Sequence, residues 1–133
     1  MLLCAPEQRC RDSARLLGEP QVCGALRECN FGRWQGMGLH DIQQAEPAAL
    51  VQWLHDPGAA PHGGESFSDV CERVGQWLDA LHPGQYTVIT HPWVLRAAFA
   101  QGLQLPAANV MRIDIEPWAH LRMTKLDHWR VRL

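Results

Sequence analysis

A strand that leads directly into a helix, with a histidine at the junction, is the strongest constraint on the fold of this chain. Residues 86–90 are mostly β-branched, His91 follows them, and Pro92 begins an amphipathic segment that extends to residue 103. Proline is favourable at a first helical position because its missing N–H would have no partner there. We therefore expect a strand over 86–90 and a helix over 92–103. Strand ends and helix N-termini of this kind bind ligands and anions, so His91 is a candidate anion-binding residue.

Other parts of the chain also alternate between helical and strand-like patterns. The clearest helical pattern begins at Ser66 and places apolar residues three and four positions apart as far as Leu81. Ser66 followed by Asp69 resembles a capping box, and Pro83-Gly84 ends the pattern. Further helices are predicted over 7–17 and 39–54, the second with a break at Pro47, and short strands over 1–4, 22–26, 111–115 and 121–126.

These elements predict an α/β fold, a three-layer α/β/α sandwich with a mainly parallel sheet. The last two predicted strands would form a hairpin around Pro117-Trp118. Segment 29–38 carries three glycines, which indicates a loop whose backbone bends sharply or closely approaches another part of the chain. Because the sequence has no internal repeat and no linker-like stretch, we expect residues 1–133 to form a single domain.

Composition and missing motifs exclude several classes of function. The net charge of −2 gives no general attraction to nucleic acid or to an acidic membrane, and we expect neither as a partner. There is no apolar stretch long enough to span a bilayer and no signal peptide, so we expect a cytoplasmic protein. Nucleotide-binding glycine motifs, the nucleophile elbow of hydrolases and the zinc-protease motif are absent. The five cysteines form no C-x-x-C pair, and we expect them to be free.

Four segments do form a pattern when they are taken in order. They are CAPEQRCRDSA at 4–14, LRECNFGRWQG at 26–36, GGES at 63–66 and TH at 90–91. Their order and spacing resemble the histidine phosphatase superfamily, in its phosphoglycerate mutase-like branch. The resemblance extends over nearly the whole chain and implies a phosphoglycerate mutase-like fold, a phosphorylated small-molecule substrate and no cofactor.

The resemblance also implies roles for three residues. Arg9 matches the arginine of the family's phosphate pocket, and a guanidinium near a helix N-terminus suits a phosphoryl group. His91 matches the second active-site histidine, which donates to phosphoryl oxygens. Glu28 matches the general acid that protonates the leaving oxygen, a role that suits a partly desolvated carboxyl group. Glu65 would be structural, and surface or structural roles are also favoured for Arg11, Arg73 and Arg96.

The chain departs from the family at its most reactive residue. Family members begin with a central strand that ends in Arg-His-Gly, whose histidine is phosphorylated, and this chain contains no Arg-His-Gly. Ala5 and Gln35 also replace a serine and a glutamate that are usual in the family, and Pro92 offers no N–H to a phosphate. We therefore expect the family's first strand and its nucleophile to be absent from the chain, which alone would be inactive.

Two hypotheses follow from this departure. In the first, the chain is part of a phosphomonoesterase that hydrolyses phosphate esters through a phosphohistidine, with the nucleophile segment absent from the chain. In the second, it is a catalytically inactive relative that binds a phosphorylated ligand or a protein partner. A mutase is less favoured, because the region between Glu28 and Glu65 lacks a long insertion. A plain α/β interaction domain is the third alternative. An unpaired sheet edge predicts self-association as a homo-oligomer.

Overall fold

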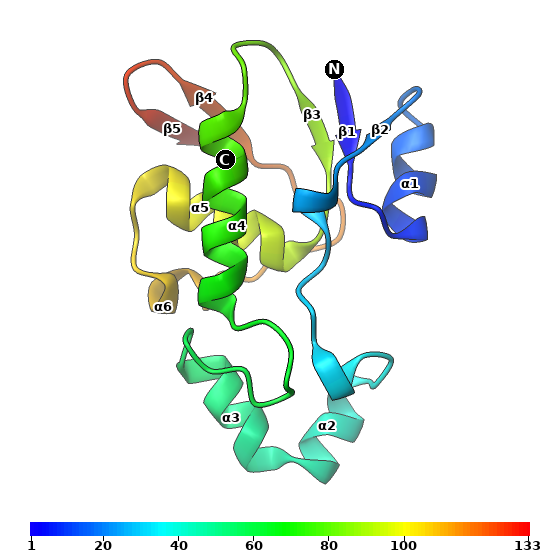
Figure 1. Cartoon of the computed structure of the whole chain (residues 1–133), viewed down its shortest axis with the longest axis vertical. Coiled ribbons are helices and arrows are strands. Elements are labelled where there is room, and N and C mark those ends of the chain that lie inside the picture. Colours follow the sequence, from blue (N-terminus) through cyan, green and yellow to red (C-terminus); the bar gives the residue numbers. More distant parts are fainter.

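Strands and helices follow each other along most of the chain (Figure 1). The computed structural model describes all of residues 1–133. The strands are β1 (Leu2–Cys4), β2 (Gln21–Val22), β3 (Thr87–Ile89), β4 (Arg122–Lys125) and β5 (Trp129–Arg132). The helices are α1 (Gln8–Arg15), α2 (Leu39–Ala45), α3 (Pro47–His55), α4 (Phe67–Ala80), α5 (Pro92–Leu103) and α6 (Ala107–Val110), with short 3₁₀ turns at Gly24–Leu26 and Gly32–Trp34. None of these helices has both the length and the apolar character needed to cross a membrane.

The first three strands form a parallel sheet in the order β2-β1-β3. Leu3 of β1 is paired with Gln21 on one side and with Val88 on the other. Since the three strands are parallel, their carboxyl ends lie at one edge of the sheet. The chain leaves β1 toward α1 and leaves β3 toward α5 at this edge, and His91 therefore lies beside the start of α1.

Helices lie on both sides of this sheet. Helix α1 packs against β1 and β3, whereas α4 and α5 pack extensively against each other on the other side (Figure 1). The buried core is largely apolar and includes Leu3 from the sheet, Val74 from α4 and Ala97 from α5. The predicted mixed α/β fold with a parallel sheet is therefore confirmed.

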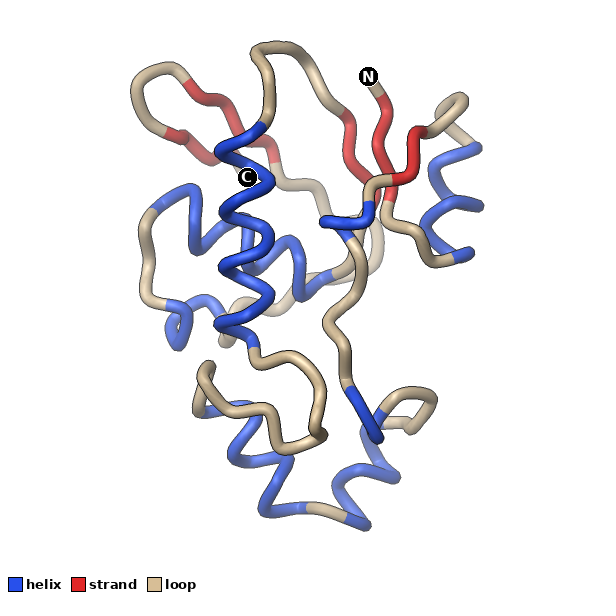
Figure 2. Tube along the Cα trace, in the orientation of Figure 1, coloured by secondary structure: helices blue, strands red, loops and turns tan.

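Helices α2 and α3 extend from this unit, and the loops beside them pass very close to each other (Figure 2). The N–H of Glu65 donates to the carbonyl of Asn30 at 2.7 Å, and that of Arg33 donates to the carbonyl of His62 at 3.0 Å. A Cβ at Gly32, where φ is +52°, would overlap the carbonyl of His62, and one at Gly64 would overlap that of Asn30. The prediction of a bent or closely approaching backbone in segment 29–38 is thus confirmed at Gly32.

Several predicted elements are confirmed closely. Helix α5 has the predicted bounds, and α4 begins with a complete capping box in which Ser66 and Asp69 bond reciprocally at 3.0 Å. The predicted break at Pro47 separates α2 from α3. The strand expected over 22–26 is shorter than predicted, because only Gln21–Val22 pairs with β1 and the chain then turns into a 3₁₀ helix.

The C-terminal region differs from the prediction. Residues 111–115 form no strand, because the carbonyl of Ile113 accepts a hydrogen bond from Nε of Arg96 at 2.8 Å instead of a ladder bond. The short helix α6 just before this region was not predicted. A hairpin does form, but from β4 and β5 rather than around Pro117-Trp118, and it is a separate antiparallel sheet.

Candidate functional site

His91 lies at the junction that the sequence predicted, immediately before α5. Its ring is buried, and its backbone is extended so that Pro92 can begin the helix. The preceding residue fixes this junction, because Oγ1 of Thr90 donates to the carbonyl of Leu26 at 2.7 Å. The histidine is therefore anchored at the carboxyl edge of the sheet, with little freedom to turn.

Two of the predicted site residues meet at Nδ1 of this ring. Nη2 of Arg9 lies 3.2 Å from Nδ1, and Oε2 of Glu28 lies 3.4 Å from the same atom. The guanidinium and the carboxylate are themselves 3.4 Å apart, with Arg9 two-thirds exposed and Glu28 mostly buried. Because Oε1 of Glu28 accepts from the N–H of Cys29, its carboxyl group is held in place. The structure thus brings together Arg9, Glu28 and His91, from three distant parts of the chain.

Glu7 occupies the other side of the histidine ring and was not predicted. Its Oε2 lies 2.8 Å from Nε2 of His91, and its Oε1 accepts from the backbone N–H of Glu28 at 2.9 Å. Burial alone would raise the pKa of Glu7, but its hydrogen bonds to His91 and to backbone N–H groups, together with the charge of His91, outweigh burial and lower this pKa. In the sequence, the only signal for Glu7 is its place at the start of a predicted helix, and acidic residues are common there in proteins of every class.

Cys10 also contacts the ring, with Sγ 3.5 Å from Nε2 of His91. Burial, followed by the charge of Glu7, raises the pKa of this thiol to about 11. The thiol is therefore protonated at neutral pH and is a poor nucleophile. No group of three or more His, Cys, Asp or Glu side chains among residues 1–133 has the geometry to hold a metal ion.

The three arginines for which the sequence favours surface or structural roles have contacts away from His91. Arg73 forms an ion pair with Glu65 at 3.0 Å, which agrees with the structural role expected for both. Arg96 stacks over Trp93 at 4.5 Å from the ring centroid. Arg11 donates to Gln8 within α1. Arg9 is therefore the one arginine of these four that contacts His91.

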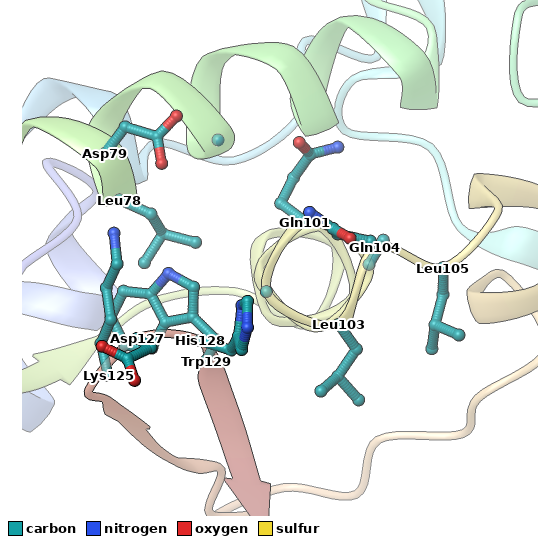
Figure 3. Close-up of a pocket in the computed structure, with 13 residues that line it drawn as sticks. Leu78, Asp79, Gln101, Leu103, Gln104, Leu105, Lys125, Asp127, His128 and Trp129 are labelled. Carbon is teal, nitrogen blue, oxygen red and sulfur yellow. The ribbon is translucent and has the colours of Figure 1, made fainter.

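A separate cavity lies elsewhere in the molecule (Figure 3). It has a volume of about 600 Å³ and lies between the C-terminal ends of α4 and α5 and the β4-β5 turn. Asp79, Gln101 and Lys125 are among the side chains that line it. None of the residues around His91 borders this space, and its size alone points to no chemistry.

A family profile decides the classification of the chain. The profile of the histidine phosphatase superfamily (branch 1) matches residues 1–133. This chain belongs to the histidine phosphatase superfamily. The resemblance on four short segments is therefore confirmed over the full length of the chain.

Two curated relatives of the chain are named as phosphatases. The chain is 34% identical to a glucosyl-3-phosphoglycerate phosphatase of Mycobacterium tuberculosis, over 77% of this chain and 53% of the relative. It is 30% identical to an adenosylcobalamin/alpha-ribazole phosphatase of Salmonella typhimurium, over 86% of this chain and 62% of the relative. The chain thus spans between half and two-thirds of the length of these curated relatives.

A solved superfamily structure agrees with this fold. A mycobacterial glucosyl-3-phosphoglycerate phosphatase in complex with VO3 superposes with a TM-score of 0.89 at 27% identity. The match covers 100% of this chain and 74% of that chain. The phosphoglycerate mutase-like fold expected from the sequence is therefore confirmed.

Proposed function

We propose that this chain supplies the phosphate-binding and general-acid side chains of a phosphomonoesterase. The enzyme would hydrolyse phosphate esters through a phosphohistidine, with the nucleophile provided by a segment outside these 133 residues. The observation that carries the proposal is the convergence of Arg9 Nη2 and Glu28 Oε2 on Nδ1 of His91, at 3.2 and 3.4 Å. A cation, a carboxyl group and an imidazole within hydrogen-bonding reach of one point are the parts that phosphoryl transfer needs.

Each of the three side chains has a distinct role in this proposal. Arg9 would neutralise part of the phosphoryl charge, and its exposure leaves the guanidinium free to turn toward a ligand. His91 would donate from Nδ1 to a phosphoryl oxygen. Glu28, held by the N–H of Cys29, would give its proton to the leaving oxygen of the ester.

In this proposal the nucleophile comes from another segment, since the sequence contains no Arg-His-Gly. The free edge of β3 supports this part of the proposal. Thr87 and Ile89 bond toward β1, which leaves the N–H and C=O of Val88 on the unpaired side of the strand. A parallel strand docked on this edge would deliver its last residue beside His91. Histidine at that position would face the phosphate held by Arg9.

The names of two relatives support a substrate class for the proposed enzyme. Two curated relatives are named as a glucosyl-3-phosphoglycerate phosphatase and an adenosylcobalamin/alpha-ribazole phosphatase. We propose a phosphorylated small molecule as the substrate here as well.

An inactive phosphate-binding relative is the second candidate. The same three side chains favour it, since they bind an anion whether or not a nucleophile is present. The two candidates make the same prediction for phosphate binding and differ only in whether a nucleophile strand restores turnover.

Binding of inorganic phosphate to the 133-residue chain tests the part that both candidates share. We expect saturable binding by titration calorimetry, weakened at least roughly tenfold by Arg9→Ala, since a charge-assisted contact to phosphate is lost. Arg15→Ala is the matched control, because this exposed arginine of the same helix pairs only with Asp12. Equal affinities for Arg9→Ala and the wild type would contradict the proposed phosphate site.

A further inference from the structure

The contacts around His91 favour one position for its ring proton in the free chain. Nδ1 faces a donor, Nη2 of Arg9, at 3.2 Å and an acceptor, Oε2 of Glu28, at 3.4 Å. Arginine has donors only, and its shorter contact favours Nδ1 as an acceptor. The proton is then on Nε2, where Oε2 of Glu7 accepts it at 2.8 Å. The other oxygen of Glu7 is already bound to the N–H of Glu28 at 2.9 Å. Both oxygens of this carboxylate therefore face donors.

We propose that Glu7 is the positioning residue of His91. It holds the Nε2–H tautomer while the site is empty, and it stabilises the doubly protonated ring when an anion binds at Nδ1. The second part rests on the proposed function, because it assumes that a phosphoryl group approaches from the side of Arg9 and Glu28.

The proton balance of the binding step is simple. A phosphoryl oxygen is an acceptor and needs an N–H at Nδ1, which in the free chain carries a lone pair. The ring takes one proton from solvent at Nδ1, and this N–H then donates to the phosphoryl oxygen. Arg9 turns its donor from Nδ1 to the phosphate. The positive charge on the ring is compensated by Glu7 on the opposite nitrogen.

Only a carboxylate satisfies both donors that face residue 7. Glutamine at this position has one acceptor oxygen, so its amide N–H₂ must face either the N–H of Glu28 or Nε2 of His91. If the oxygen stays on the backbone, the amide donates to Nε2 and forces the proton to Nδ1, where Oε2 of Glu28 can accept it. Glu7→Asp retains two acceptors but is one methylene shorter.

The tautomer can be read directly from the ¹⁵N signals of the histidine side chains in labelled full-length chain at pH 8. The His91 signals are identified by their absence in His91→Gln. We expect Nε2–H in the wild type and in Glu19→Gln, an exposed acidic control. In Glu7→Gln we expect a shift to Nδ1–H. A wild-type ring that carries Nδ1–H, or an unchanged tautomer in Glu7→Gln, would overturn the proposal.

The direction in which Glu7→Gln changes the affinity for inorganic phosphate gives an independent test of the proposal. Removing a negative charge beside an anion site should tighten phosphate binding if Glu7 were merely a neighbour. We expect the opposite, a roughly tenfold weakening of inorganic phosphate binding in Glu7→Gln and a smaller loss in Glu7→Asp. Tighter binding in Glu7→Gln would refute a positioning role. If the wild type shows the expected tautomer but binds no phosphate, the proposed function fails while the tautomer assignment stands.

Discussion

Arg73 and Glu65 form a two-point ion pair that fixes the segment carrying Glu28. Nη2 and Nε of Arg73 lie 3.0 and 3.1 Å from the two carboxylate oxygens, and both side chains are largely buried. Nη1 of Arg73 also donates to the carbonyls of Ala25 and Arg27. Arg73, a side chain of helix α4, thus holds the backbone just before Glu28, the proposed general acid.

Removing Arg73 should therefore be costly. We expect Arg73→Ala to lower the free energy of unfolding by about 2–4 kcal/mol, because several mostly buried acceptors and a carboxylate lose their partner. Urea unfolding measures the change. Arg27→Ala is the control, since this half-exposed side chain is 3.9 Å from Glu65 and should contribute less than about 1 kcal/mol. Equal losses in the two variants would argue against a special role for Arg73.

The close approach of two loops predicts a strong effect at Gly64. A Cβ there would overlap the backbone carbonyl of Asn30, which is itself hydrogen-bonded to Glu65 and cannot move freely. We expect Gly64→Ala to destabilise the chain by about 2 kcal/mol or more in thermal or urea unfolding. Gly24→Ala should be close to neutral, because no atom lies within 4 Å of a Cβ at that position. Similar stability of the two variants would show that the loops can separate at no cost.

His62 is a buried histidine surrounded by aromatic rings. The ring centroids of Phe31, Trp34 and Trp53 lie 5.6, 5.1 and 4.9 Å away. Nδ1 accepts from the N–H of Gly64 at 2.9 Å, and Nε2 has no partner. Burial, with the nearby charge of Arg33, lowers the pKa of His62. The folded chain therefore favours the neutral ring.

This lowered pKa predicts that stability falls with acidification. Above the ordinary histidine pKa of about 6.5 both states are neutral and stability is at its full value. Below pH 6.5, about the ordinary histidine pKa, His62 binds a proton in the unfolded chain but stays neutral in the folded chain. The free energy of unfolding therefore drops by up to about 1.4 kcal/mol per pH unit until the pH reaches the pKa of His62 in the folded chain. Unfolding free energies measured between pH 5 and 6.5 should show a smaller slope in His62→Phe. The carboxylates with lowered pKa values titrate below this window.

Local patterns predicted most of the fold because they depend on neighbouring residues. The capping box at Ser66, the proline start of α5 and the break at Pro47 are all set within one helical turn. The prediction of a strand over 111–115 was wrong because the conformation there depends on a residue far away in the sequence. A distant side chain, Arg96, takes the carbonyl of Ile113, and alternating apolar residues cannot reveal that contact.

The candidate site shows the same limit. Arg9, Glu28 and His91 could be predicted as site residues because the resemblance to the superfamily implies a role for each. Glu7 lies at a position that carries no such pattern, and its importance depends on a fold that brings it to within 2.8 Å of a ring 84 residues later. No sequence spacing encodes that approach.

Hydrolysis of p-nitrophenyl phosphate tests the central claim most directly. The assay compares two proteins: the 133-residue chain, and the same chain joined through a flexible linker to a strand that ends in Arg-His-Gly. We predict no His91-dependent turnover for the chain alone. We predict turnover for the fusion, lost when the added histidine, Arg9 or His91 is replaced by alanine. Clear His91-dependent turnover by the unfused chain would contradict the claim that the nucleophile lies outside these residues.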